Sequence, residues 1–259
     1  MVHRILIVTA VAAEADSVAA GLGPDAPETA PETAWEPLSL PGGLALRRHA
    51  GGVDLLVGGV GPAAVAAATG TALAHASLTG AGSGTPYDLV VSAGIAGGFA
   101  PHAPIGTVVV SGAIVAADLG AETPDGYLAV EELGFGRSTH PVPPSLTGPL
   151  SAALRAGDRP HTVAPVLTVS TVTGTAGRAA ELAARHPAAA AEAMEGFGVA
   201  EAAAAYGVPV VEIRAVSNAV GPRDRAAWRI GEALDSLRQA FALLGPAVFM
   251  NPTVFVEAK

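Results

Sequence analysis

The chain of 259 residues contains no cysteine, and its only lysine is the last residue, Lys259. The absence of cysteine excludes disulfides, zinc–thiolate sites, iron–sulfur clusters and thiol nucleophiles. Aromatic residues make up 4% of the chain although half of it is hydrophobic. The core must therefore consist mainly of Ala, Val, Leu and Ile, whose small side chains suit helices packed on a sheet.

Basic side chains are also scarce, and the formal net charge is −9. No basic stripe exists to neutralise phosphates, which argues against a nucleic-acid partner and against an anionic membrane surface. The apolar run from Met1 to Ala13 is short, and Glu14 follows it directly, so we interpret it as a buried strand leading into a helix rather than a signal peptide. We expect a soluble, cytoplasmic protein with no membrane span, no cofactor and no metal.

Apolar strand patterns alternate with helical patterns along the chain, which predicts a single α/β domain over residues 1–259 with a mostly parallel central sheet flanked by helices. The expected strands are Ile5–Thr9, Leu44–His49, Val53–Gly58, Leu89–Ser92, Thr107–Ser111, Thr162–Ser170, Ala188–Met194 and Val208–Val216. The expected helices are Glu14–Gly21, Pro62–His75, Ala176–Arg185, Gly196–Tyr206 and Arg225–Leu244. The expected irregular segments are Gly23–Trp35, Thr79–Thr85, the turn Gly94–Gly98 and the long loop Asp118–Pro144.

Polar residues follow three of the expected strands. Glu14 comes just past the first strand, Glu195 ends the apolar run before it, and the pair Ser217–Asn218 ends a third strand. Ligands of open α/β sheets bind beyond the carboxyl ends of the strands, so these residues could share one site. Each also has a simpler interpretation, because Glu14 and Glu195 suit the first turn of a helix and Asn218 suits a turn before Gly221.

Two glycine clusters could indicate nucleotide binding by their composition, but their spacing does not support that interpretation. The run Gly94–Gly98 lacks the full dinucleotide fingerprint and also fits a tight turn, and the run Gly58–Gly61 lacks the lysine of a Walker motif.

Taken together, the segments resemble methylthioadenosine/S-adenosylhomocysteine nucleosidases of the purine nucleoside phosphorylase superfamily. The resemblance is carried by the first strand with Glu14, by the run VSAGIAGGF (91–99), by Met194-Glu195-Gly196 and by IRAVSN (213–218). It implies that Glu14 is a catalytic acid or base and that Met194 and Glu195 contact ribose. The substrate-binding residues expected on this basis are Ile95, Ala96, Gly97, Gly174, Thr175, Ala193, Met194, Glu195 and Ser217.

Two departures favour one subfamily. The adenine-specific enzymes carry Asp where this chain has Asn218, and usually Glu where it has Ala193. The longer patterns MEGFGVAE (194–201) and SNAVGPRDR (217–225) are similar to futalosine hydrolases, which release hypoxanthine from futalosine in menaquinone biosynthesis. A 6-oxopurine presents two acceptors, O6 and N7, on one edge, and a side-chain amide can donate to that edge. Asn218 therefore favours hypoxanthine or guanine over adenine as the leaving base.

Cleavage of a purine nucleoside passes through a ribosyl cation, so we expect Asn218 to stabilise charge on the departing purine and Glu14 to deprotonate the attacking water. Phosphorolysis would need a cluster of cations for the phosphate dianion. We expect no arginine near Glu14 and expect the pair Arg47–Arg48 at a solvated strand edge. A purine nucleoside phosphorylase or a methylthioadenosine/S-adenosylhomocysteine nucleosidase is the alternative, and a storage or binding relative would be expected to lack one of the two acids.

The 5′ substituent of futalosine carries a carboxylate, which a negative protein must hold with a local cation. Arg223 and Arg225 are the first candidates because they follow Asn218 closely, and Arg137 in the long central loop is the next. Surface pairing of Arg223 and Arg225 with Asp224 or nearby acids is an equally good interpretation. The resemblance also implies a homo-oligomer, a dimer or higher, in which the site is completed across the interface.

Overall fold

The computed structural model describes residues 4–23, 35–79 and 86–251. The strands are β1 (Ile5–Thr9), β2 (Trp35–Ser39), β3 (Ala45–His49), β4 (Val53–Val57), β5 (Leu89–Gly98), β6 (Val108–Ala116), β7 (Gly120–Thr123), β8 (Gly126–Ala129), β9 (Thr139–Pro141), β10 (His161–Thr168), β11 (Ala191–Ala193) and β12 (Val210–Ala219). The α-helices are α1 (Ala12–Leu22), α2 (Pro62–Thr79), α3 (Pro144–Ala156), α4 (Ala176–Arg185), α5 (Gly196–Ala205) and α6 (Ile230–Leu244). Short helical turns cover Pro41–Gly43, Arg225–Ala227 and Gly245–Phe249.

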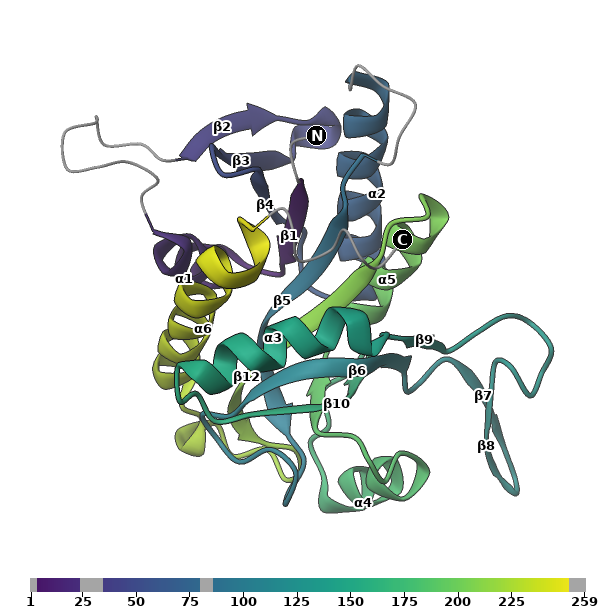
Figure 1. The fold of residues 1–259 in the computed structure, drawn as a ribbon. Coiled ribbons are helices and arrows are strands. Elements are labelled where there is room, and N and C mark those ends of the chain that lie inside the picture. The colour runs from purple at the N-terminus through teal and green to yellow at the C-terminus, as the bar shows by residue number, and fades with distance from the viewer. Residues whose placement is uncertain (1–3, 24–34, 80–85, 252–259) are drawn as a thin grey trace.

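One ten-stranded sheet runs through the molecule in the order β11-β10-β6-β12-β5-β1-β4-β3-β2, with β9 paired to β6 (Figure 1). The central strands β4, β1, β5 and β12 are all parallel neighbours. Antiparallel pairs occur at the β2–β3–β4 edge and where β12 meets β6. The expected α/β class with a mostly parallel core is therefore confirmed, and the sheet as a whole is mixed.

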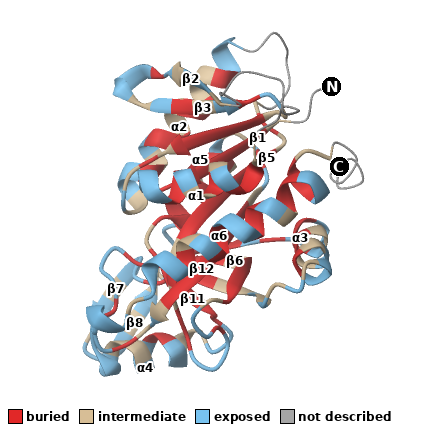
Figure 2. Cartoon of the chain, turned by 90° about the vertical axis from the view of Figure 1, so that its left-hand side faces the viewer, coloured by how far each residue is buried: buried red, intermediate tan, exposed pale blue. Residues whose placement is uncertain are grey.

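Strand β1 shows why the core has two layers. Ile5 and Ile7 face a cluster that also contains side chains of α1, α3 and α6, whereas Leu6 and Val8 face a cluster built with α2 and α5. A strand buried on both faces reads as a continuous apolar run because successive side chains point to opposite sides. Figure 2 shows the central strands as the most buried part of the chain, with the exposed residues on the outer helix faces and at the β7–β8 hairpin.

Five of the strands close into a barrel. The pairings β5–β12–β6–β10–β11 return to β5, because β11 also pairs antiparallel with the end of β5 through Ala191–Gly98 and Glu192–Gly97. Side chains from all five strands, among them Ala96, Val166 and Val216, pack together in its interior. The closure brings β11 beside the carboxyl ends of β5 and β12, which are the strand ends expected to carry the site.

Several sequence expectations are wrong. Residues Gly94–Gly98 continue strand β5 instead of forming a turn, and β12 extends through Ala219, so Ser217 and Asn218 lie within the strand. The expected loop Asp118–Pro144 contains the hairpin β7–β8 and strand β9. Strand β2 and helix α3 were not expected. The last helix begins at Ile230, after a short helical turn over Arg225–Ala227.

Two other expectations concern segments that are only partly described. The expected loop Thr79–Thr85 and the excursion Gly23–Trp35 lie mostly outside the described residues. Within the described ranges, no helix is long and apolar enough to cross a membrane. No group of three or more His, Cys, Asp or Glu side chains is placed to hold a metal ion in those ranges.

Candidate active site

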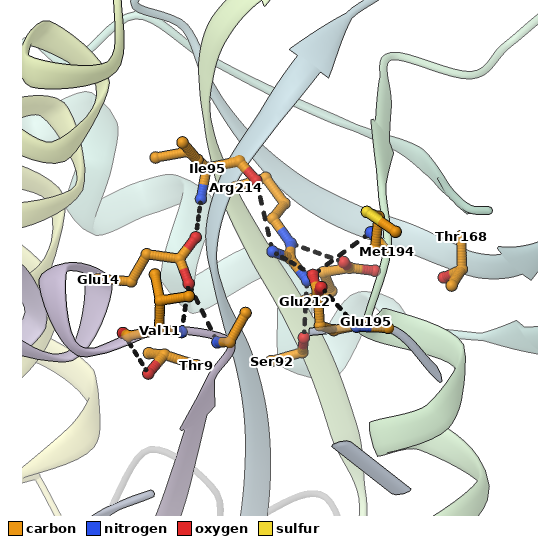
Figure 3. A network of polar contacts seen from close by, with 12 residues as sticks. Thr9, Val11, Glu14, Ser92, Ile95, Thr168, Met194, Glu195, Glu212 and Arg214 are labelled. Atoms are coloured by element: carbon orange, nitrogen blue, oxygen red, sulfur yellow. Dashed lines mark hydrogen bonds and ion pairs between the residues drawn. The ribbon is translucent and has the colours of Figure 1, made fainter. Parts of the chain in front are cut away.

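Glu14 lies in the first turn of α1 and is 4% exposed. One carboxylate oxygen accepts hydrogen bonds from the backbone N–H groups of Ala10 at 3.0 Å and Val11 at 3.3 Å. The other accepts one from the N–H of Ile95 on β5 at 2.9 Å (Figure 3). The bond to Val11 is the helix-capping role that the simpler interpretation expected. The bond to Ile95 goes beyond capping and ties the carboxylate to the carboxyl end of the neighbouring strand.

Arg214 is the largest fully buried side chain, 1% exposed, and it projects from β12. Its Nε lies 2.8 Å from Glu212 Oε1, and its Nη1 lies 3.2 Å from Glu195 Oε2. Nη2 also donates to the Ser92 hydroxyl at 3.1 Å. Figure 3 shows the guanidinium in the middle of this network, with Glu14 on its other side. The expectation that no arginine lies near Glu14 is wrong, because the parallel pairing of β12 with β5 brings Arg214 to it.

Gly94 shows how closely Glu14 and Arg214 approach. A Cβ atom at this position would overlap both Glu14 Oε1 and Arg214 Nη1. Only a residue without a side chain leaves room for the two groups to share this part of the strand. The glycine run that suggests a turn in the sequence therefore serves close side-chain approach in the structure.

Glu195 stands at the N-cap position of α5, but its side chain makes no capping bond there. Instead, Oε1 accepts from the N–H of Gly61 at 3.2 Å, and Oε2 accepts from the N–H of Met194 at 3.3 Å. Gly61 has φ +90°, a conformation that favours glycine. The glycine run before α2 thus supplies a backbone donor that fixes Glu195, and the carboxylate faces Arg214 rather than the helix end.

Three carboxylates surround one guanidinium, so the cluster is negative if all of them are ionised. Burial raises the pKa of Glu14, and the positive charge of Arg214 opposes this rise. Burial also raises the pKa of Glu212, again against the effect of Arg214. A carboxylate with a raised pKa is a stronger base than an ordinary one, which suits proton abstraction near neutral pH.

Ser217 and Asn218 occupy a bulge in β12. The register with β5 shifts between Val216 and Asn218, so Asn218 rather than Ser217 stands opposite Gly97. Bulges redirect side chains and are frequent beside active sites. The Asn218 amide nitrogen donates to the Ala219 carbonyl at 3.0 Å, and its oxygen lies 2.8 Å from the Ser217 hydroxyl. The second N–H of the amide is available for a ligand.

The other expected base-binding and ribose-binding residues lie around this bulge. Ala96 accepts from the Ser217 hydroxyl at 3.2 Å, and Ala193 and Met194 lead directly into Glu195. Gly174 accepts a backbone hydrogen bond from Arg223 at 3.1 Å, which joins its segment to the one that follows Asn218.

Thr175 is tied to helix formation, because its hydroxyl caps α4 by accepting from the N–H of Arg178. The structure therefore brings the expected residues of β5, β11 and β12 together and joins the Gly174 segment to the residues that follow Asn218, whereas the hydroxyl of Thr175 serves helix α4.

The arginines proposed for the 5′ end differ in their surroundings. Arg223 and Arg225 are exposed, and their guanidinium carbons lie 5.3 Å and 5.9 Å from the ring centroid of Trp228. Neither forms an ion pair with an acid among the described residues. Arg137 is bound to Glu201 at 3.1 Å. The first two are thus the available cations near Asn218.

The side chains of Arg47 and Arg48 are solvated as expected, 33% and 45% exposed, but they do not lie on an edge strand. Strand β3 is an inner strand, and the two side chains are paired with Asp16 at 2.8 Å and with Asp54 at 2.9 Å.

Comparison with known proteins identifies the family of this chain. The family model described as "Phosphorylase superfamily" matches residues 4–247. A futalosine hydrolase of Streptomyces coelicolor is 59% identical over 245 residues, which cover 95% of this chain and 96% of that protein. The chain belongs to the futalosine hydrolase family. A second futalosine hydrolase, from Acidothermus cellulolyticus, is 46% identical over 93% of this chain and 90% of its own length.

Solved structures with the fold of this family member include both nucleosidases and futalosine hydrolases. A Helicobacter pylori methylthioadenosine nucleosidase mutant bound to 5′-methylthioadenosine has a TM-score of 0.75 at 17% identity, covering 96% of this chain and 99% of that chain. The futalosine hydrolase of Helicobacter pylori has a TM-score of 0.72 at 17% identity, covering 93% and 95%. At such identities the likeness shows the fold alone.

Three residues that bind Glu14, Glu195 or each other in this futalosine hydrolase family member were not predicted from the sequence: Arg214, Glu212 and the donor Gly61. A signal for the first two was present. They are the only charged residues of strand β12, and their spacing of two places both side chains on one face. Buried charges are seldom retained without a partner or a function. Another missed residue is Glu192, whose carboxylate accepts from the N–H of Thr173 at 2.9 Å.

Proposed function

We propose that this protein cleaves the N-glycosidic bond of futalosine with water and releases hypoxanthine. Sequence identity with two futalosine hydrolases supports the substrate. The observation that carries the chemistry is Glu14, a buried carboxylate held by three backbone N–H groups at the strand edge where Asn218 and Glu195 also lie. In this proposal the reaction is a step of menaquinone biosynthesis.

Glu14 acts as the general base on the attacking water. Its oxygens are fixed by backbone donors, so the carboxylate is already oriented before substrate binds. As C1′ loses its bond to N9, the electron pair of that bond stays on the purine, which takes a proton from solvent and leaves as hypoxanthine. C1′ gains a bond to the water oxygen, and the water proton passes to Glu14, which afterwards returns it to solvent. Burial, which raises the pKa of Glu14, makes it a better acceptor for that proton.

Asn218 and Glu195 act on the two departing halves. The free N–H of the Asn218 amide donates to O6 or N7 of the purine, where negative charge develops as the glycosidic bond breaks. Glu195 accepts hydrogen bonds from ribose hydroxyls, and these bonds strengthen as the ribose becomes cationic. The partly exposed Met194 packs under the sugar.

Water is favoured over phosphate because the cation nearest Glu14 is already neutralised. Arg214 forms ion pairs with Glu212 and Glu195, and its positive charge also lowers the pKa of Glu14 against the effect of burial. A phosphate dianion in this position would face three carboxylates around a single guanidinium. Removing Arg214 from its partners would leave buried charges unpaired, which is costly.

The protein is also proposed to be a cytoplasmic homo-oligomer. Phe135 is 81% exposed in the segment that links the β7–β8 hairpin to β9, and Val60 is 57% exposed beside Gly61. Contiguous exposed apolar surface is typical of interaction surfaces, and these two side chains are candidates for such a surface between copies of the chain. Light scattering of the purified protein tests this proposal, and a monomer at micromolar concentration would refute it.

A substrate panel tests the proposed reaction. Purified protein is incubated separately with futalosine, its 6-amino analogue, inosine and methylthioadenosine, and the released base is quantified by chromatography. Futalosine should give the highest kcat/KM. Preferential release of adenine from methylthioadenosine would replace the proposal with a methylthioadenosine nucleosidase activity.

A further inference from the structure

Glu192 lies on β11 with a side chain that is 5% exposed. Its neighbours Ala191 and Ala193 point into the barrel, where they pack with Ala96 and Val216. Because side chains alternate along a strand, Glu192 points to the outer face of the barrel. A buried acid on this strand needs partners, and none of the mechanism described above uses it.

Glu192 and Asn218 stand in one row across the sheet. Glu192 is the direct antiparallel partner of Gly97, and Gly97 is the direct parallel partner of Asn218. Directly opposite residues share a face of the sheet. A Cβ at Gly97 would come 3.3 Å from the Asn218 amide nitrogen, which places that amide over the glycine. The two polar side chains are therefore two strands apart, about 9–10 Å at the backbone, on the same face.

The carboxylate of Glu192 engages both hydrogen-bond donors of Thr173. Oε1 accepts the backbone N–H at 2.9 Å, and Oε2 accepts the hydroxyl. Thr173 precedes Gly174, whose carbonyl accepts a hydrogen bond from the N–H of Arg223. The segment that contains Thr173 therefore lies beside the segment that follows Asn218. With its donors occupied, Thr173 can offer a ligand only acceptors, its carbonyl oxygen and the lone pairs of its hydroxyl, and Glu192 can offer only its remaining lone pairs. The wall on this side of the site is built of acceptors.

We propose that Glu192 sets the preference for a 6-oxopurine by making the wall across from Asn218 an acceptor-only surface. A 6-oxopurine carries a hydrogen on N1 and can donate to such a wall. A 6-aminopurine has a lone pair on N1, which would meet only other lone pairs. Asn218 thus donates a hydrogen bond to O6 or N7 of the base. The Glu192–Thr173 pair accepts a hydrogen bond from N1–H on the other side. This inference rests on the proposed function and adds a specificity-determining residue to it.

The test compares kcat/KM for futalosine and its 6-amino analogue, which share the 5′ substituent. Glu192→Gln replaces one carboxylate oxygen with an NH2 group and so places a donor in the wall. The ratio of futalosine to 6-amino analogue should fall by about 10- to 100-fold, the effect of mismatching one buried hydrogen bond. An equal loss on both substrates, with the ratio unchanged, would overturn the proposal and leave Glu192 a structural residue.

Glu131 provides a matched control. One oxygen of its carboxylate, Oε1, accepts both the backbone N–H and the hydroxyl of Ser138, so Glu131 likewise binds both donors of one hydroxyl residue, here in the segment between β8 and β9. Glu131→Gln should leave the ratio unchanged. If it shifted the ratio as much as Glu192→Gln does, the proposal would be wrong.

A second variant keeps the proposal testable if Glu192→Gln fails to fold. Glu192→Met has a similar length, frees both Thr173 donors, and should also shift the ratio toward the 6-amino substrate. A folded Glu192→Met variant with an unchanged ratio would contradict the proposal.

Failure of the proposed function would be seen separately, as no futalosine cleavage by the wild type. In that case, calorimetric affinities of wild type and Glu192→Gln for hypoxanthine and adenine still decide the role of Glu192. The substitution should weaken the binding of hypoxanthine relative to the binding of adenine. Equal changes in the two affinities would refute the role of Glu192.

Discussion

Replacing Glu14 with Gln perturbs the site in a defined way. The wild-type carboxylate accepts three backbone hydrogen bonds, two on one oxygen from Ala10 and Val11 and one on the other from Ile95. A glutamine amide offers one acceptor oxygen, and its NH2 group is a donor. The oxygen can keep the two donors that precede α1, Ala10 and Val11, which leaves the NH2 group pointing at the N–H of Ile95.

The expected loss of stability follows from this single mismatched hydrogen bond, and the expected loss of activity follows from the missing general base. One buried donor without an acceptor costs about 1–3 kcal/mol of folding free energy. For a domain of this size each kcal/mol lowers Tm by about 2–4 °C, so the variant should remain folded with a Tm a few degrees lower. Loss of a general base should reduce kcat by about 10²-fold or more. KM should change little, because the proposed purine and ribose contacts are made by other residues.

The assay measures hypoxanthine release at saturating futalosine, together with Tm by calorimetry. Glu232→Gln is the matched control, since Glu232 is also a first-turn acid, of α6, but is exposed. It should retain wild-type kcat. A folded Glu14→Gln variant with near-normal kcat would show that Glu14 only caps α1.

Four further results are expected. Glu195→Ala should raise KM and lower kcat together, because it removes ribose contacts and one partner of the buried guanidinium. A lower Tm with unchanged kcat and KM would indicate a purely structural role. Asn218→Asp should weaken futalosine cleavage relative to its 6-amino analogue by about tenfold or more, and an unchanged ratio would contradict the amide's role. Arg223→Ala or Arg225→Ala should raise KM for futalosine several-fold but not for inosine, whereas equal losses on both would mean loop support. Because burial raises the pKa of Glu14 and the base acts when ionised, kcat/KM should decline with falling pH from a higher pH than an ordinary glutamate would set; a profile flat into that ordinary range would exclude it as the base.

The strand-end acids were predictable from the sequence because local patterns place them. Glu14 and Glu195 each follow an apolar run, and parallel strands bring their carboxyl ends to one edge. The contact of Arg214 with Glu14 was not predictable in this way. It depends on which strands are neighbours, and β12 joins β5 across more than a hundred residues of chain.

The glycine and proline segments were the least predictable parts of the fold. Gly94 indicates a turn by composition, but its lack of a side chain accommodates Glu14 and Arg214 inside a strand. Helix α3 begins at Pro144 and contains Pro149, which ordinarily argues against a helix. Its buried leucines, Leu146, Leu150 and Leu154, recur every four residues, and that spacing was the available signal.

Hypoxanthine release from futalosine in phosphate-free buffer distinguishes water from phosphate as the nucleophile. If water attacks C1′, we expect full activity without phosphate, equal rates when millimolar phosphate is added, and a free sugar hydroxyl at C1′ of the second product by mass spectrometry. Release that requires phosphate and yields a sugar 1-phosphate would contradict the assignment of water as the nucleophile.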